Sequence, residues 1–309
     1  MSKRSGLTVI IAALLSCTQN PGSPHIPVNI AALYSHVNFL SSLPAPRNSE
    51  NLTSLNAAAH YVDSVFSAVC SHVKNQTFPV EGTEYQNVIC TFGQGKNPTV
   101  VVGAHYDVAG DQPGADDNAS GVAALLEVAW LLNNLKPELT HRIELVAYTL
   151  EEPPYFGTEF MGSAVHARAL NEEDTDVKAV IALDMIGYFD PEPRRIRLPL
   201  GLSYPMSRDF IGVVGRLSDL RTASIIKRWM RRGSGIEVHQ ASIPPSWVKW
   251  VSWSDHRNYW TYGYPAVLIT DTSFYRNPHY HKKTDTVDTL DFSQMAEVVK
   301  GVYWAVVNL

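Results

Sequence analysis

The sequence predicts an α/β fold built around a mainly parallel sheet, and two observations lead to that prediction. Short runs rich in β-branched and other apolar residues, such as Thr99–Val102 and Val177–Leu183, are typical of strands buried on both faces. These runs alternate with stretches whose apolar residues recur at helical spacing, such as Gly121–Leu135. Alternation of this kind is the pattern of strand–helix–strand units in a parallel sheet.

The other elements follow the same two patterns along the chain. Helical spacing of apolar residues predicts the helices Ile30–Leu40, Asn51–Val69, Gly121–Leu135, Met161–Leu170, Pro205–Leu217 and Phe292–Val307. Strands are expected as an alternating pair over His72–Cys90 and in the apolar runs Thr99–Val102, Arg142–Leu150, Val177–Leu183 and Pro265–Thr270. The stretch Phe189–Ser252 is the least regular, and we expect it to form excursions over an active site.

Length and composition limit the classes of function. The chain has 309 residues, of which 45% are hydrophobic and 18% are charged, which suits one large α/β domain or two small ones. The formal net charge of −5 provides no general basic field to attract nucleic acid. Nucleic-acid binding is therefore not expected.

The N-terminal residues have the pattern of an export signal rather than of a folded element. Two basic residues precede the uncharged run Leu7–Leu15, which is too short to span a membrane. The segment Leu14–Cys17 is similar to the cleavage box of bacterial lipoproteins, in which the Cys is lipidated and begins the mature chain. We expect residues 1–16 to be a signal peptide and Cys17 to attach the protein to a membrane, with ordinary secretion as the alternative.

Export has consequences for the segments that follow. Residues 17–28 are rich in Pro, Ser and Asn, which predicts a flexible tether. The protein would then lie in the periplasm or outside the cell, where the surroundings are oxidising. Cys70 and Cys90 are therefore a candidate disulfide, although their spacing fits two buried free thiols equally well.

Candidate metal ligands follow the ends of the expected buried strands, where ligands collect in parallel sheets. Singly, each residue has a local explanation as a turn former, a helix cap or a solvated charge. Together they offer enough imidazole and carboxylate groups for two zinc ions. A two-metal hydrolase also needs a bridging carboxylate and a carboxylate that takes a proton from water. In chain order the candidates are His105, Asp107, Asp117, Glu151, Glu152, Asp184 and His281.

These motifs resemble those of a known family. The order "GAHYD", "GADDNASG", "EE", "ALDMIGY", "SDH", "YH" and "DT" is similar to that of the co-catalytic zinc aminopeptidases, family twenty-eight of the metallopeptidases, which includes bacterial leucyl aminopeptidase. The resemblance extends over residues 29–309, which would form a single catalytic domain. It implies a three-layer α/β/α sandwich with a mixed, mainly parallel central sheet, and hydrolysis of N-terminal peptide bonds.

The resemblance also implies a role for each candidate residue. His105 and Asp184 would hold one zinc ion, and Glu152 and His281 the other. Asp117 would bridge the two ions. The two catalytic residues would be Glu151 as the general base and Asp107 as the group that orients His105 through its far ring nitrogen.

The sequence departs from the family pattern or leaves a choice open at three points. The segment after Glu151-Glu152 is longer than is usual and could reshape the rim of the site. His279 and His281 both precede the "DT" motif, and we favour His281 because of its distance from Asp285. His256 in the "SDH" motif is expected to form hydrogen bonds within the wall of the site and not to bind metal.

Two other functions fit the same fold. Glutaminyl cyclases are similar in sequence pattern but use one zinc ion for intramolecular amide chemistry. A receptor-type domain without catalysis is the other alternative, although it would be expected to lack ligands or the base. The sequence does not specify the preferred N-terminal residue of the peptide or aminoacyl substrate, the native metal or the oligomeric state.

Overall fold

The computed structural model describes residues 25–190, 195–197, 203–205 and 210–309 of the chain. The predicted signal peptide and Cys17 lie outside these residues, so the expectations for them stay predictions. None of the described helices is long and apolar enough to cross a membrane.

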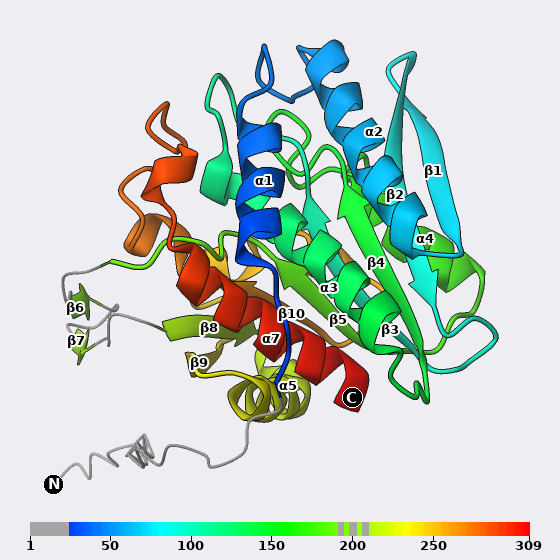
Figure 1. The fold of residues 1–309 in the computed structure, drawn as a ribbon, viewed down its shortest axis with the longest axis vertical. Coiled ribbons are helices and arrows are strands. Elements are labelled where there is room, and N and C mark those ends of the chain that lie inside the picture. The colour runs from blue at the N-terminus through cyan, green and yellow to red at the C-terminus, as the bar shows by residue number, and fades with distance from the viewer. Residues whose placement is uncertain (1–24, 191–194, 198–202, 206–209) are drawn as a thin grey trace, which may run out of the picture.

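The centre of the molecule is an eight-stranded sheet in the order β1-β2-β4-β3-β5-β10-β8-β9 (Figure 1). Pairing is parallel along β4-β3-β5-β10 and between β8 and β9, and it is antiparallel in the pairs β1-β2, β2-β4 and β10-β8. The predicted mixed, mainly parallel sheet is therefore confirmed. The strands are β1 (Val73–Val80), β2 (Thr83–Phe92), β3 (Thr99–His105), β4 (Arg142–Tyr148), β5 (Val177–Leu183), β8 (Phe210–Gly215), β9 (Glu237–Ser242) and β10 (Ala266–Thr270).

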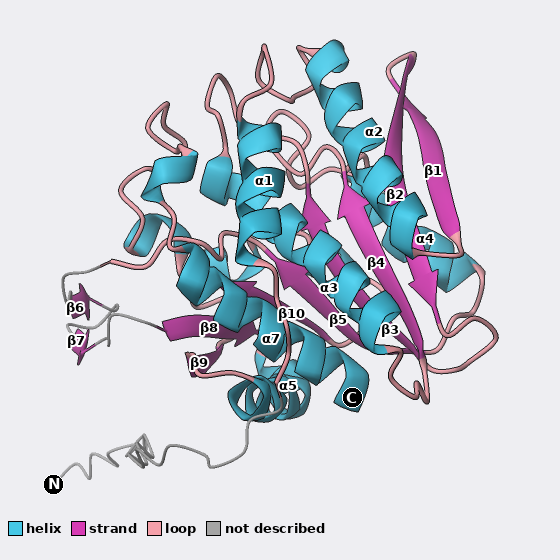
Figure 2. Ribbon diagram, viewed as in Figure 1, coloured by secondary structure: helices cyan, strands magenta, loops and turns pink. Residues whose placement is uncertain are grey.

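Helices cover both faces of this sheet, which gives the predicted three layers (Figure 2). One face is covered by α1 (Ile30–Ser41), α2 (Leu52–Val69), α3 (Gly121–Leu135), α5 (Leu220–Gly233) and α7 (Phe292–Asn308). The other is covered by α4 (Gly162–Glu172) and α6 (His256–Trp260). A separate two-stranded antiparallel sheet consists of β6 (Arg195–Arg197) and β7 (Ser203–Pro205).

Burial on both faces explains the apolar runs in the sequence. All seven residues of β3 are buried, because helices cover this central strand on either side. The strand ends at His105, so its last side chain lies at the carboxyl edge of the sheet. The same holds for β4 and β5, which end shortly before Glu151 and Asp184.

The predicted helix over Pro205–Leu217 is wrong. Phe210–Gly215 forms β8, an entirely buried strand between β10 and β9, and Leu217–Asp219 forms a short 3₁₀ turn. Residues 206–209 lie outside the described part of the chain. The apolar run Phe-Ile-Gly-Val-Val-Gly is too short to distinguish a helix from a strand by spacing, and its β-branched residues fit a sheet.

The expectation that Phe189–Ser252 forms excursions over the site is also wrong for most of its described residues. Besides β8, this stretch contains α5 and β9, which complete the sheet and one of its helical layers. The buried side of α5 consists of Ala223, Ile226, Met230 and Gly233. Basic residues between these positions obscured the helical pattern.

Cys70 and Cys90 form a disulfide. The bond joins the C-terminal cap of α2 to strand β2, and Cys90 is fully buried. The alternative of two free thiols, which the sequence left open, does not apply to this structure.

A polar contact joins α1, α2 and α3 at the edge of the core. Nδ1 of His36 on α1 lies 2.7 Å from the Tyr61 hydroxyl on α2, and its Nε2 lies 4.0 Å from a Glu127 carboxylate oxygen on α3. Burial lowers the pKa of His36 to about 4, because desolvation disfavours the charged imidazole. The neutral ring can accept a hydrogen bond from Tyr61.

This pKa makes folding stability dependent on pH. In the unfolded chain His36 takes up a proton near its ordinary pKa of 6.5, whereas in the fold it does so only near pH 4. Stability from this residue is therefore complete above about pH 6.5 and is lost as the pH falls to about 4, by up to about 3 kcal/mol. We expect His36→Gln to reduce the pH dependence of the free energy of unfolding, measured with urea, over this pH interval. His60→Gln, on an exposed position of α2, is the control, and an unchanged slope in His36→Gln would contradict the assignment.

Candidate metal centre

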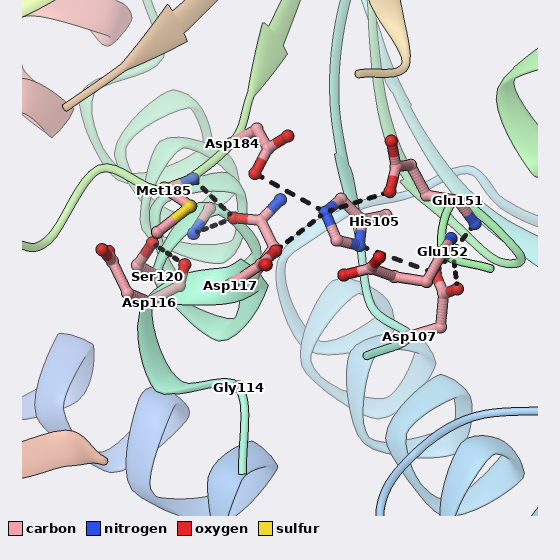
Figure 3. Close-up of polar contacts among 12 residues, drawn as sticks. His105, Asp107, Gly114, Asp116, Asp117, Ser120, Glu151, Glu152, Asp184 and Met185 are labelled. Carbon is pink, nitrogen blue, oxygen red and sulfur yellow. Dashed lines mark hydrogen bonds and ion pairs between the residues drawn. The ribbon is translucent and has the colours of Figure 1, made fainter. Parts of the chain in front are cut away.

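Imidazole and carboxylate groups from five parts of the chain meet at the carboxyl edge of the sheet, and Figure 3 shows four of these parts. His105 ends β3, Glu151 and Glu152 follow β4, and Asp184 follows β5. Asp117 lies in the turn Ala115–Ser120, which connects the loop after β3 to α3. The sequence analysis expects these residues to lie close together, because parallel strands place their carboxyl ends at one edge of the sheet.

The first group of potential ligands surrounds His105. Its Nε2 lies 3.5 Å from Oδ1 of Asp117, 3.6 Å from Oδ1 of Asp184 and 3.9 Å from Oε2 of Glu151. His105, Asp117 and Glu151 are nearly inaccessible to solvent. Three acidic groups thus converge on one ring nitrogen.

The second group lies on the other side of Asp117. Nε2 of His281 lies 3.2 Å from Oδ2 of Asp117 and 3.5 Å from Oε1 of Glu152. Asp117 therefore directs one oxygen toward each group, which is the geometry that a bridging carboxylate needs. His279 is not part of this group: its Nδ1 lies 2.9 Å from the Thr284 hydroxyl, so the structure brings His281 to the site.

The donor atoms fit a divalent metal. Both ring nitrogens of His105, Oδ2 of Asp117 and Oε1 of Glu152 are buried and have no hydrogen-bond partner among the described residues. Buried polar atoms are rarely left without partners, and a bound ion is one of the ordinary reasons. Imidazole and carboxylate are the ligands that zinc prefers when no thiolate is offered.

The pKa shifts show the same need for positive charge. Burial, followed by the charge of Glu152, raises the pKa of Asp117 to about 7. Burial also raises the pKa of Glu151 well above its ordinary value. Burial lowers the pKa of His281, but the nearby carboxylates of Asp117 and Glu152 outweigh this effect and raise the pKa to about 10. A bound cation would lower the pKa of these carboxylates and favour their ionised form.

Comparison with known proteins identifies the family. Residues 87–306 of the chain match Peptidase family M28. The chain belongs to this family. It is therefore a peptidase by family, as the sequence motifs predicted.

Individual relatives agree with the assignment. The chain is 41% identical over 283 residues to the uncharacterized protein YfbL of Escherichia coli (strain K12), covering 88% of this chain and 86% of YfbL. It is 28% identical over 237 residues to Leucine aminopeptidase 1 of Fusarium vanettenii, covering 72% of this chain but only 54% of the fungal protein. The chain thus spans about half the length of that aminopeptidase.

Solved structures share the fold. The Legionella pneumophila LapA aminopeptidase superposes with a TM-score of 0.72 at 21% identity, covering 93% of this chain and 76% of LapA. The glutaminyl cyclase of Bacteroides thetaiotaomicron superposes with a TM-score of 0.69 at 19% identity, covering 92% of this chain and all of the cyclase. At these identities the likeness shows the three-layer fold alone.

In this M28 peptidase Asp107 supports both the histidine and the glutamates. Its Oδ1 lies 3.6 Å from Nδ1 of His105. Its two oxygens also accept hydrogen bonds from the backbone N–H groups of Glu151 (3.1 Å) and Glu152 (3.0 Å). The sequence suggested the first contact, and the second gives Asp107 a wider positioning role.

Asp285 supports the Asp117 turn by accepting hydrogen bonds from two backbone N–H groups, as Asp107 does for the two glutamates. Oδ1 of Asp285 accepts from the N–H of Asp116 (2.9 Å), and Oδ2 accepts from the N–H of Asp117 (3.1 Å). The residue is fully buried. The "DT" motif contained this residue, but sequence reasoning assigned it no function.

A buried arginine was also missed. Arg47, in the loop between α1 and α2, is 2% exposed, and burial lowers its pKa to about 10 despite the nearby carboxylates. Its guanidinium donates to the backbone carbonyls of Leu40, Tyr106, Pro113 and Gly114. It therefore fixes the loop before Asp117 and brings one permanent positive charge near the site.

The "SDH" segment forms a wall of the site. His256 is fully buried and its Nε2–H donates to the Val251 carbonyl at 2.7 Å. Burial lowers the pKa of His256 to about 4, so the ring is neutral at ordinary pH. The hydrogen bond agrees with the role expected from the sequence.

Replacing Asp285 should loosen the metal centre without unfolding the chain. In Asp285→Asn, an amide N–H would face one of the two backbone N–H groups, so the Asp117 turn would lose part of its support. Loss of such a supporting contact lowers metal affinity by roughly 10- to 100-fold. Competition with a chromophoric zinc chelator would measure this, with Asp288→Asn, an exposed position nearby, as control. Equal affinities in the two variants would refute the positioning role.

Proposed function

We propose that the chain is a zinc aminopeptidase that uses two metal ions to hydrolyse the N-terminal bond of a peptide or aminoacyl substrate. The observation that carries the proposal is the position of Asp117, whose two oxygens face separate groups of potential ligands. The family assignment and the similarity to leucine aminopeptidases support the reaction class.

The ligand roles follow from the two groups. His105 and Asp184 would hold one zinc ion, Glu152 and His281 would hold the other, and Asp117 would bridge them. When bound, the two ions supply Lewis acidity that polarises the scissile carbonyl and lowers the pKa of a water molecule. Asp107, whose Oδ1 lies 3.6 Å from Nδ1 of His105, would orient the ring of His105.

Glu151 is the proposed general base. It is buried, it precedes the ligand Glu152 directly, and its N–H is fixed by Asp107. Its Oε2 lies 3.9 Å from Nε2 of His105 (Figure 3). In that position Oε2 can take a proton from the attacking water and deliver it to the leaving amine.

Glu151→Gln tests the assignment of the base. The amide keeps the shape of the side chain but cannot accept the proton, so we expect kcat to fall by roughly 100- to 10,000-fold while zinc content stays the same. The matched control is Glu159→Gln, an exposed glutamate of the following loop. Full activity in Glu151→Gln would exclude Glu151 as the base.

Substrate specificity and metal content distinguish the proposal from its alternatives. We expect two zinc ions per chain and cleavage of aminoacyl arylamides, but no cleavage when the α-amine is blocked. One zinc ion together with cyclisation of N-terminal glutamine would instead indicate the glutaminyl cyclase reaction. Full zinc occupancy without activity on either substrate class would favour a receptor-type domain.

A further inference from the structure

Helix α5 carries a concentration of positive charge. This 14-residue helix carries five basic residues and no acidic one, although the whole chain has a net charge of −5. The basic residues are Arg221, Lys227, Arg228, Arg231 and Arg232. A local surface of this kind can attract an anionic partner that the net charge would repel.

The basic residues face away from the core. The opposite side of α5 packs on α7, where Gly233 lies against Trp304 so closely that a β-carbon would approach its side chain to 2.2 Å. Arg221, Arg228 and Arg231 are exposed, as is Arg232. Within the described part of the chain, none of these four arginines forms an ion pair.

Apolar side chains border the basic face: Trp229 is half-buried against the core, and two leucines near the start of the helix are exposed. The Trp229 ring has the guanidinium carbons of Arg228 and Arg232 at 5.2 and 5.0 Å from its centre. Leu217, in the 3₁₀ turn before the helix, and Leu220, the first residue of the helix, are 57% and 49% exposed. Arginines combined with Trp and Leu are typical of surfaces that bind at the boundary between lipid headgroups and acyl chains.

The location of α5 fits a bilayer on one side of the molecule. In Figure 1, α5 lies at the lower end of the long axis, where the N-terminal end of the described chain also lies. Strands β3 and β4 direct their carboxyl ends, and with them the metal centre, toward the other end. If Cys17 carries lipid, the chain from there to His25 spans at most about 30 Å.

We propose that the basic face of α5 binds the anionic headgroups of a lipid bilayer and thereby holds the metal centre away from the membrane surface. Arginines supply the attraction to phosphate, and Trp229 with the two leucines supplies contact with the upper acyl chains. Because of this apolar contribution, lipid fits the face better than nucleic acid. The proposal does not depend on the peptidase reaction.

Vesicle binding by the full chain tests the proposal. Cys17→Ser removes any covalent lipid, and its binding is compared on vesicles of phosphatidylcholine alone and of phosphatidylcholine mixed with phosphatidylglycerol. We expect binding only to the mixed vesicles, with weakening by added salt. Adding Arg228→Gln, Arg231→Gln and Arg232→Gln should weaken binding on the order of 100-fold.

A matched triple variant distinguishes binding by the α5 face from attraction by the positive charges elsewhere on the protein. Lys74→Gln, Lys136→Gln and Lys249→Gln remove the same number of exposed cations outside α5 and should leave binding unchanged. Equal losses in both triple variants, or no binding of the Cys17→Ser protein to the mixed vesicles, would overturn the proposal. Tighter binding to duplex DNA than to these vesicles, with the same dependence on α5, would also overturn it in favour of nucleic acid.

A second measurement locates the helix at the lipid. Brominated acyl chains quench nearby tryptophans, so bound Cys17→Ser protein should lose more fluorescence on brominated mixed vesicles than the same protein with Trp229→Phe. Identical quenching would show that Trp229 does not reach the bilayer, which contradicts the proposed orientation.

Discussion

Carboxylates buried within a few ångströms of one another are the constraint that organises this molecule. Each would cost several kcal/mol to desolvate as an isolated charge, and neighbouring negative charges add to that cost. Three features reduce it: two histidines, a buried arginine, and backbone N–H groups aimed at carboxylates. The raised pKa of Asp117 shows that these features do not neutralise the site completely. A bound divalent cation is the natural remaining compensation.

The supporting carboxylates explain how the ligands keep their positions. Asp107 and Asp285 each use both oxygens to accept hydrogen bonds from two consecutive backbone N–H groups. Three of the four residues so fixed are potential ligands or the proposed base: Glu151, Glu152 and Asp117. This arrangement leaves the ligand side chains free of other hydrogen bonds, as the unpartnered atoms of His105, Asp117 and Glu152 show. Positioning is thus done through the backbone, and the side chains remain available to metal.

Much of the sheet and of the candidate site could be predicted because both depend on local patterns. Buried strands have continuous apolar sequences, and their ends lie at one edge in a parallel sheet. The contacts of Arg47 had no such pattern, since its partners are backbone carbonyls that no sequence motif marks. Strand β8 was read as a helix because a short apolar run fits both periods, and only its pairing with β10 decides the matter.

Strand direction connects the two ends of the molecule. Parallel strands place the acidic candidate ligands at their carboxyl edge. The basic helix α5 lies toward the opposite end of the molecule. Over this separation, salt screens the attraction between its cations and the carboxylates of the site. The candidate site and the basic helix therefore lie toward different ends of the long axis. This arrangement would orient the protein at any anionic surface and leave the metal centre open to substrates from the solvent.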